Sequence, residues 1–264
     1  MISTINLAAR NLTRYRRRTL LTSLLITLGV TALLIFLAAA GSFKQTMIGS
    51  ITDSMLGHLQ VHRKGYTASI DNLPLNLSLQ PKAVSRIEEM LKAEPEILAY
   101  SKRVKLGAMF SNFTENTSIR LNGVDPAAED ATVPGLRQRI NDGDKTGALV
   151  SPGKVLIPQL LARGMKVKVG DQVVLVVTNS SGSVNGKPFT VGGILDGVTG
   201  PGGRDGYIHI DDVRELLRME QPEVMEIAVR LKSLAKLGEV QQRLSKALDE
   251  IRNKENKPAT ELHL

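Results

Sequence analysis

The residue types that catalyse reactions or bind metal ions are few in this sequence, and their spacing forms no recognised site. The chain has no cysteine and four histidines, at positions 58, 62, 209 and 263. His58 and His62 lie in a segment that alternates apolar and polar residues, as a strand does, and side chains at this spacing stand about 13 Å apart along a strand. That separation is too large for two ligands of one zinc ion. We therefore interpret the histidines as structural polar residues.

Other potential catalytic motifs fail in the same way. Asp211 and Asp212 are adjacent, so their carboxylates point in different directions, and the pair is typical of a helix start rather than of a hydrolase. Gly186-Lys187 resembles the end of a phosphate-binding loop, but the required glycine five residues earlier is Ser181. No G-x-S-x-G context surrounds a serine. The sequence predicts a chain that is not an enzyme and that itself holds no cofactor or metal.

Charge and composition argue against a nucleic-acid partner. The formal net charge is +8, but residues 1–18 contain five arginines and no acidic residue, so most of the basic excess is local. Aromatic residues make up 3% of the chain and tryptophan is absent, which leaves few platforms for base stacking. The five arginines are Arg10, Arg14, Arg16, Arg17 and Arg18. We expect them at a membrane surface instead, because an uncharged run follows them.

An uncharged run of residues from 19 to 43 follows these arginines. At 1.5 Å per residue such a helix is about 37 Å long, which exceeds the roughly 30 Å hydrocarbon core of a bilayer. The excess of arginine before the run places the N-terminus in the cytoplasm by the positive-inside rule. A cleavable signal peptide is the alternative, because Ala38-Ala39-Ala40 resembles a cleavage site. The run is, however, much longer than the apolar region of a signal peptide, which has about 7–15 residues. Residues 1–18 are either an amphipathic helix on the inner membrane surface or a basic tail that only sets the topology.

The residues from 44 to 264 predict a globular extracytoplasmic domain of mixed structure. The apolar periodicity predicts helices over 81–95, 211–219 and 234–252, and continuation of the membrane helix beyond the bilayer. Strands are predicted over 57–63, 97–110, 117–124, 154–158, 173–177, 188–195, 207–210, 224–231 and 260–264, with Asn185-Gly186 as a hairpin turn. The fold class predicted is α+β: one transmembrane helix, then an α/β layer from residues 57–125 and 207–264, with a β-rich subdomain inserted at residues 150–206.

A glycine-rich segment between residues 196 and 206 joins the last two parts. It is either a partner-contacting loop or a flexible connection. The residues selected as candidates for partner contact are Asp196, Gly200, Pro201, Arg204 and Asp205.

Four stretches together resemble a family of bacterial transport proteins. They are NLAARNLTRYRRRTLLTSLLITLGV, GHLQV, KVLIPQLLARGMKVKVGDQVVLV and FTVGGILDG. Their order along the chain is similar to that in the ABC transporter permeases that include LolC, LolE, MacB and FtsX, and the first two stretches look most like the lipoprotein-releasing type. The resemblance implies an inner-membrane permease subunit with a periplasmic domain between its first two membrane helices, driven by ATP hydrolysis on a separate ABC ATPase subunit.

The same resemblance implies further partners: a second permease copy or paralogue, membrane lipid, and a periplasmic carrier protein or lipoprotein substrate. The chain ends at Leu264, where such a permease approaches its second membrane helix, so we expect it to be a truncated permease. Two alternatives of other classes remain open. One is a single-pass receptor or protein-interaction module, and the other is a membrane-anchored envelope enzyme.

Overall fold

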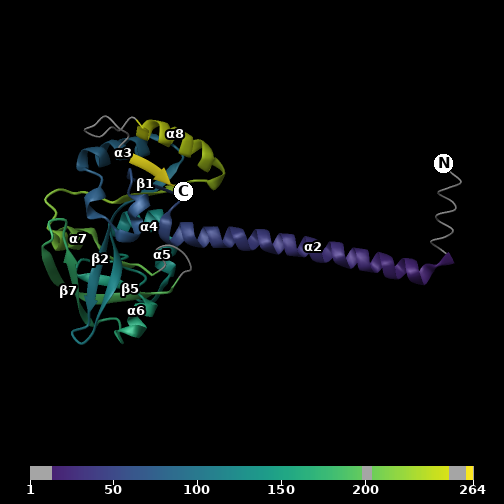
Figure 1. Ribbon diagram of the computed structural model, residues 1–264, viewed down its shortest axis with the longest axis horizontal. Coiled ribbons are helices and arrows are strands. Elements are labelled where there is room, and N and C mark those ends of the chain that lie inside the picture. The colour runs from purple at the N-terminus through teal and green to yellow at the C-terminus, as the bar shows by residue number, and fades with distance from the viewer. Residues whose placement is uncertain (1–13, 198–203, 250–259, 264) are drawn as a thin grey trace. The chain divides into compact units, whose positions relative to one another are not determined.

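The computed structural model describes residues 14–197, 204–249 and 260–263 and divides the chain into two compact units, Met1–Gly49 and Ser50–Leu264 (Figure 1). The first unit consists mainly of helix α2, which spans Arg16–Ile51 and ends two residues inside the second unit. Residues Arg16–Phe43 of this helix have a mean hydropathy of 2.5, and none of the most apolar stretch is buried within the protein. By length and composition it is the one helix among the described residues that can cross a membrane.

The local structure of α2 follows from its residue types. It contains no proline, and the Thr22 hydroxyl donates a hydrogen bond of 2.9 Å to the Arg18 carbonyl, so the polar group is satisfied within the helix. Large apolar side chains such as Leu25 and Leu28 are exposed at 70% and 68%. A helix that is apolar on all sides and unburied is suited to lipid rather than water. The predicted continuation of the helix beyond the uncharged run is confirmed, because α2 extends to Ile51 and η1 (Thr52–Leu56) follows it directly.

One part of the second unit is an antiparallel sheet with strand order β10-β1-β9-β2. Helices α3 and α8 pack against one another, α3 on β2 and α8 on β10, and their apolar stripes complete this part of the core (Figure 1). The bounds are β1 Leu59–Arg63, β2 Ile97–Ser111, β9 Glu226–Leu231, β10 Thr260–His263, α3 Pro81–Ala93 and α8 Leu237–Asp249.

The other part is a closed ring of strands. Each strand pairs with the next in the order β2, β3, β8, β5, β7, β6, and β6 pairs with β2 again, which closes the ring. Strand β4 pairs with β7 outside the ring. The bounds are β3 Asn116–Val124, β4 Ile140–Gly143, β5 Lys154–Pro158, β6 Gln172–Thr178, β7 Val184–Leu195 and β8 Gly206–His209. Closure leaves these strands without free edges.

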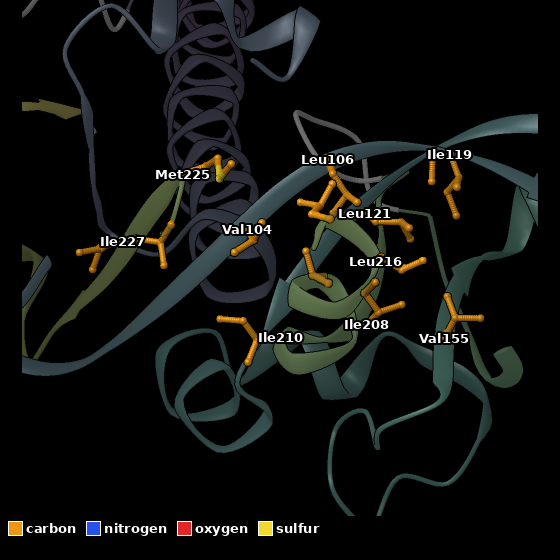
Figure 2. Close-up of a cluster of buried hydrophobic side chains, with 14 of the residues drawn as sticks. Val104, Leu106, Ile119, Leu121, Val155, Ile208, Ile210, Leu216, Met225 and Ile227 are labelled. Carbon is orange, nitrogen blue, oxygen red and sulfur yellow. The ribbon is translucent and has the colours of Figure 1, made fainter. Parts of the chain in front are cut away.

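Short helices cover or connect these strands. Helix α7 packs on β2, β3, β6, β7 and β8. Leu216 on α7 belongs to the same buried hydrophobic cluster as Leu106 and Leu121 (Figure 2). The remaining bounds are η2 Thr67–Asn72, η3 Leu75–Leu77, α4 Pro126–Thr132, α5 Gly135–Gln138, α6 Gln159–Gly164, α7 Ile210–Leu217 and η4 Leu234–Lys236.

Most predicted strands and helices are confirmed, and one predicted turn is wrong. Asn185-Gly186 lies inside β7, where the Asn185 amide donates a 3.1 Å hydrogen bond to the Leu216 carbonyl. The hairpin instead turns at residues 179–182, because the Asn179 carboxamide oxygen accepts bonds from the amides of Ser181 and Ser183 at 3.1 and 2.8 Å. The second half of the hairpin therefore starts earlier than predicted.

Helix α4 was not predicted, although its sequence carries the usual start signals. Asp125 caps the helix by accepting a 2.9 Å bond from the Ala128 amide, and Pro126 occupies the first turn.

The strands group differently in the structure from the predicted division into an α/β layer and an inserted β-rich subdomain. Strands β3 and β8 come from the stretches assigned to the α/β layer, yet both belong to the ring with β5, β6 and β7.

Replacing Gly123 with alanine tests the contact between the ring and α7. A Cβ at position 123 would lie 2.2 Å from the Val213 Cγ2 atom, so α7 or β3 must shift. We expect the free energy of unfolding to fall by about 1–3 kcal/mol, measured by urea denaturation, and to recover in part when Val213→Ala is added. Gly164→Ala is the matched control, because a Cβ there meets nothing within 4 Å. A neutral Gly123→Ala would contradict this packing.

Candidate functional site at the junction of the domain

Five buried charged or titratable side chains meet where the sheet joins the ring. We call them the junction cluster: His62 on β1, Arg103 and Lys105 on β2, Glu129 on α4 and Glu226 on β9. Arg103 is the residue at which β2 changes partners, since it pairs with Glu226 of β9 and with Val124 of β3. The cluster therefore lies at the point that links the two parts of the domain.

Arg103 connects two buried carboxylates. Its Nη1 atom lies 2.7 Å from Glu226, and its Nε and Nη2 atoms contact the two carboxylate oxygens of Glu129 at 3.1 and 2.8 Å. Lys105 Nζ completes the pairing of Glu226 at 2.5 Å. Because two cations face two carboxylates, the four charges balance, and the guanidinium fixes α4 relative to β2 and β9.

The electrostatic surroundings set the protonation of Glu226. Burial alone would raise its pKa, but Lys105 and Arg103 lower the pKa to about 2. Burial is also the largest influence on the nearby Tyr207 hydroxyl and raises its pKa. Glu226 is therefore a carboxylate at neutral pH, and it is committed to the pair rather than available as a general acid.

His62 borders the cluster on β1. Its Nε2 atom lies 3.7 Å from the Glu226 carboxylate and 3.3 Å from the Gln60 carboxamide oxygen, and its ring stacks on Tyr66 at 4.9 Å between centroids. Burial lowers the pKa of His62, and Lys105 opposes the attraction of Glu226. The structure supports the interpretation of this histidine as a structural polar residue.

A second group of contacts holds the end of the apolar helix to the domain. Ser54 and Met55 of η1 are buried, and the carboxylate of Asp53 lies 2.9 Å from Nη1 of Arg230 on β9. Arg139, which follows α5, donates from Nη1 to the Ser54 carbonyl at 3.4 Å. The segment after α2 is therefore part of the domain core rather than a free linker.

The arginines predicted at the membrane surface lie at the start of α2. Arg14, Arg16, Arg17 and Arg18 are exposed, and Arg14 lies 5.8 Å from the centre of the Tyr15 ring. Arg10 is outside the described residues.

The predicted partner-loop residues have different roles. Asp196 contributes its backbone to Arg139, whereas Asp205 is buried, pairs with Arg120 at 3.4 Å and accepts a bond from Asn122. Arg204 lines an open groove of about 1270 Å³ whose apolar residues include Met109 and Leu160. Gly200 and Pro201 lie outside the described residues.

Sequence reasoning missed the junction cluster. The available signal was the run of basic residues Lys102, Arg103 and Lys105 in a strand that also carries Val104 and Leu106. Charges on both faces of one strand indicate either an edge or a buried ionic network. Within the described ranges, no group of three or more histidine or acidic side chains is arranged to hold a metal ion. The arrangement is suited to fixing segments relative to one another.

Comparison with known proteins identifies the fold and the family. The chain is similar to the extracellular domain of the noncanonic ABC-type transporter YknZ from Gram-positive bacteria, with 15% identity and a TM-score of 0.50 over 78% of this chain and 99% of that one. It is also similar to the periplasmic region of MacB from Actinobacillus actinomycetemcomitans, with 13% identity and a TM-score of 0.52 over 78% and 87% of the two chains. No curated protein sequence matches it significantly.

These structures confirm the predicted fold class of a mixed α/β domain after one apolar helix. The profile of the MacB-like periplasmic core domain matches residues 19–247, which is most of the chain and includes the apolar helix. The chain therefore belongs to the family of MacB-like periplasmic core domains.

Proposed function

We propose that this chain is the N-terminal portion of an ABC transporter permease subunit. It couples ATP hydrolysis in the cytoplasm to movement of its periplasmic domain, for lipoprotein release or for export of amphiphilic substrates. The observation that carries the proposal is the continuity of α2 into η1, whose Ser54 and Met55 are buried in the domain. A helix that ends inside a packed core transmits displacement better than one that ends in a loose linker.

The proposal assigns an inner-membrane location with a cytoplasmic N-terminus and a periplasmic domain. Its partners are an ABC ATPase that carries the ATP, a second permease copy or paralogue, membrane lipid, and a periplasmic carrier or lipoprotein. The family match and the apolar helix support a membrane-anchored extracytoplasmic domain. The junction cluster supports movement of the sheet and the ring as one body, because separating them would expose or unpair buried charges.

Isolation from the native membrane tests the proposal. In a mild detergent, an ABC ATPase should co-purify with the chain, and its hydrolysis rate should change several-fold when the Asp53 and Arg230 pair is disrupted by Arg230→Ala. Arg214→Ala is the control, because Arg214 pairs with exposed Asp211 on α7. Isolation of the chain without any ATPase, as a complete single-pass protein, would instead favour a receptor or interaction module.

Charge reversal at the start of α2 tests the orientation. Replacing Arg14, Arg16, Arg17 and Arg18 with glutamate removes the cytoplasmic anchor, so we expect insertion to be lost or inverted. The domain of the variant should then resist protease added to intact spheroplasts, whereas the wild-type domain should be digested. Equal digestion of both proteins would contradict the role of these arginines.

A further inference from the structure

The side chain of Arg139 bridges two segments that are far apart in sequence. Its Nε and Nη2 atoms donate to the Asp196 carbonyl at 3.2 and 3.1 Å, and its Nη1 atom donates to the Ser54 carbonyl at 3.4 Å. In return, the Asp196 amide donates to the Arg139 carbonyl at 2.7 Å. Arg139 is 5% exposed, so water cannot readily replace either carbonyl.

The first of these segments is the end of the apolar helix. Ser54 belongs to η1, directly after α2, and α5 packs closely against it. A Cβ at Gly135, the first residue of α5, would lie 3.0 Å from the Asp53 carbonyl oxygen and 3.1 Å from the Ser54 Cβ. A displacement of Ser54 therefore reaches α5 and Arg139 directly.

The second segment is the end of β7. Leu195 is buried and pairs with Ile140 of β4, and Asp196 is the residue at which the strand gives way to the glycine-rich segment. A planar guanidinium that donates to two carbonyls requires both of them at a fixed separation. If only one carbonyl moved, the buried cation would lose donor contacts at a large cost in free energy.

We propose that Arg139 is a positioning residue that makes the end of β7 follow the end of the apolar helix. When the helix end shifts, Arg139 carries Asp196 with it, and so changes the start of the segment that leads to β8. The inference rests on the proposed function for the source of the helix movement. The coupling itself is a property of this chain and is measured without a transporter.

A double-mutant cycle measured by hydrogen exchange tests the coupling. In the full chain in detergent, Gly135→Ala displaces Asp53 and Ser54, and we expect exchange of the amides at residues 194–196 to rise about tenfold. In an Arg139→Gln background, exchange there should already be raised, and Gly135→Ala should add little. Arg139→Lys, which keeps the charge but not the planar donors, should behave as Arg139→Gln does and covers the case in which the glutamine variant fails to fold.

Arg137→Gln is the matched control. Arg137 lies on α5, as Gly135 does, but it bonds to Asp130 and to the carbonyls of Lys145 and Gly147. The effect of Gly135→Ala on residues 194–196 should therefore persist in the Arg137→Gln background. Additive effects of Gly135→Ala and Arg139→Gln, or exchange that neither change alters, would overturn the coupling. Those results leave ATPase co-purification unaffected, so failure of the coupling and failure of the proposed function are distinguishable.

Discussion

Replacing Arg103 with leucine is expected to lower the free energy of unfolding by about 3–5 kcal/mol. The substitution removes the cation that pairs with both Glu129 and Glu226, two fully buried carboxylates. Lys105 still pairs with Glu226, but among the described residues Glu129 has no other ion-pair partner. Urea denaturation of the full chain in detergent, followed by circular dichroism, measures the change.

Lys102→Ala is the matched control for this prediction. Lys102 is the preceding residue on β2 and pairs with Glu88 at 2.9 Å, but its side chain is 35% exposed. A partly exposed pair of this kind contributes about 0–1 kcal/mol. If Arg103→Leu and Lys102→Ala cost the same, the junction cluster does not hold the domain together.

The domain is also expected to lose stability in acid through Glu226. Its folded-state pKa of about 2 lies below the ordinary value of 4.5, so its contribution is complete above about pH 4.5 and is lost as the pH falls towards 2. The difference corresponds to a contribution on the order of 3 kcal/mol. His62 adds to the loss at higher pH. Burial lowers its pKa below 6.5, so the neutral form is favoured in the fold and stability falls as the pH drops below about 6.5.

The slope of stability against pH separates these contributions. Glu226→Gln should be less stable at neutral pH, yet its free energy of unfolding should change less between pH 5 and 2 than that of the wild type. His62→Gln should reduce the loss of stability that begins as the pH falls below about 6.5. Parallel pH profiles for the wild type and Glu226→Gln would show that Glu226 does not carry the acid sensitivity.

Much of the fold could be predicted because local patterns decide it. The uncharged run after the arginines has the length and composition of a membrane helix. Pro81 and the apolar stripe that follows it fix the start and the buried face of α3. Strand β5 was recognised from the short apolar segment KVLIP. These features depend on residues close together in sequence.

The closure of the ring and the junction cluster depend on distant contacts instead. Alternation of Leu59 and Val61 with Gln60 and His62 predicts a half-buried strand. All four side chains are nevertheless buried, because Glu226 of β9 is a charged partner for both Gln60 and His62 on the polar face. Nothing near Glu129 in sequence indicates that it pairs with Arg103, since that pairing requires the arrangement of α4, β2 and β9. For the same reason the bridge from Ser54 through Arg139 to Asp196 could not be predicted.

The two groups of contacts together hold the parts of the domain in fixed positions relative to one another. The junction cluster joins the sheet to the ring, and the contacts of Asp53, Ser54 and Arg139 join the end of the helix to both. A displacement that enters at η1 is therefore distributed through charged side chains that resist separation.

The central claim is that the domain is extracytoplasmic and anchored to the membrane. Labelling of single cysteines in intact cells tests it most directly, because the chain contains no cysteine of its own. Ser181 is exposed at the turn between β6 and β7, and Ser3 precedes the apolar helix in the sequence. A membrane-impermeant maleimide should label Ser181→Cys in intact cells and Ser3→Cys only after lysis. Labelling of Ser3→Cys in intact cells, or protection of both positions with the protein in the soluble fraction, would contradict a membrane-anchored extracytoplasmic domain.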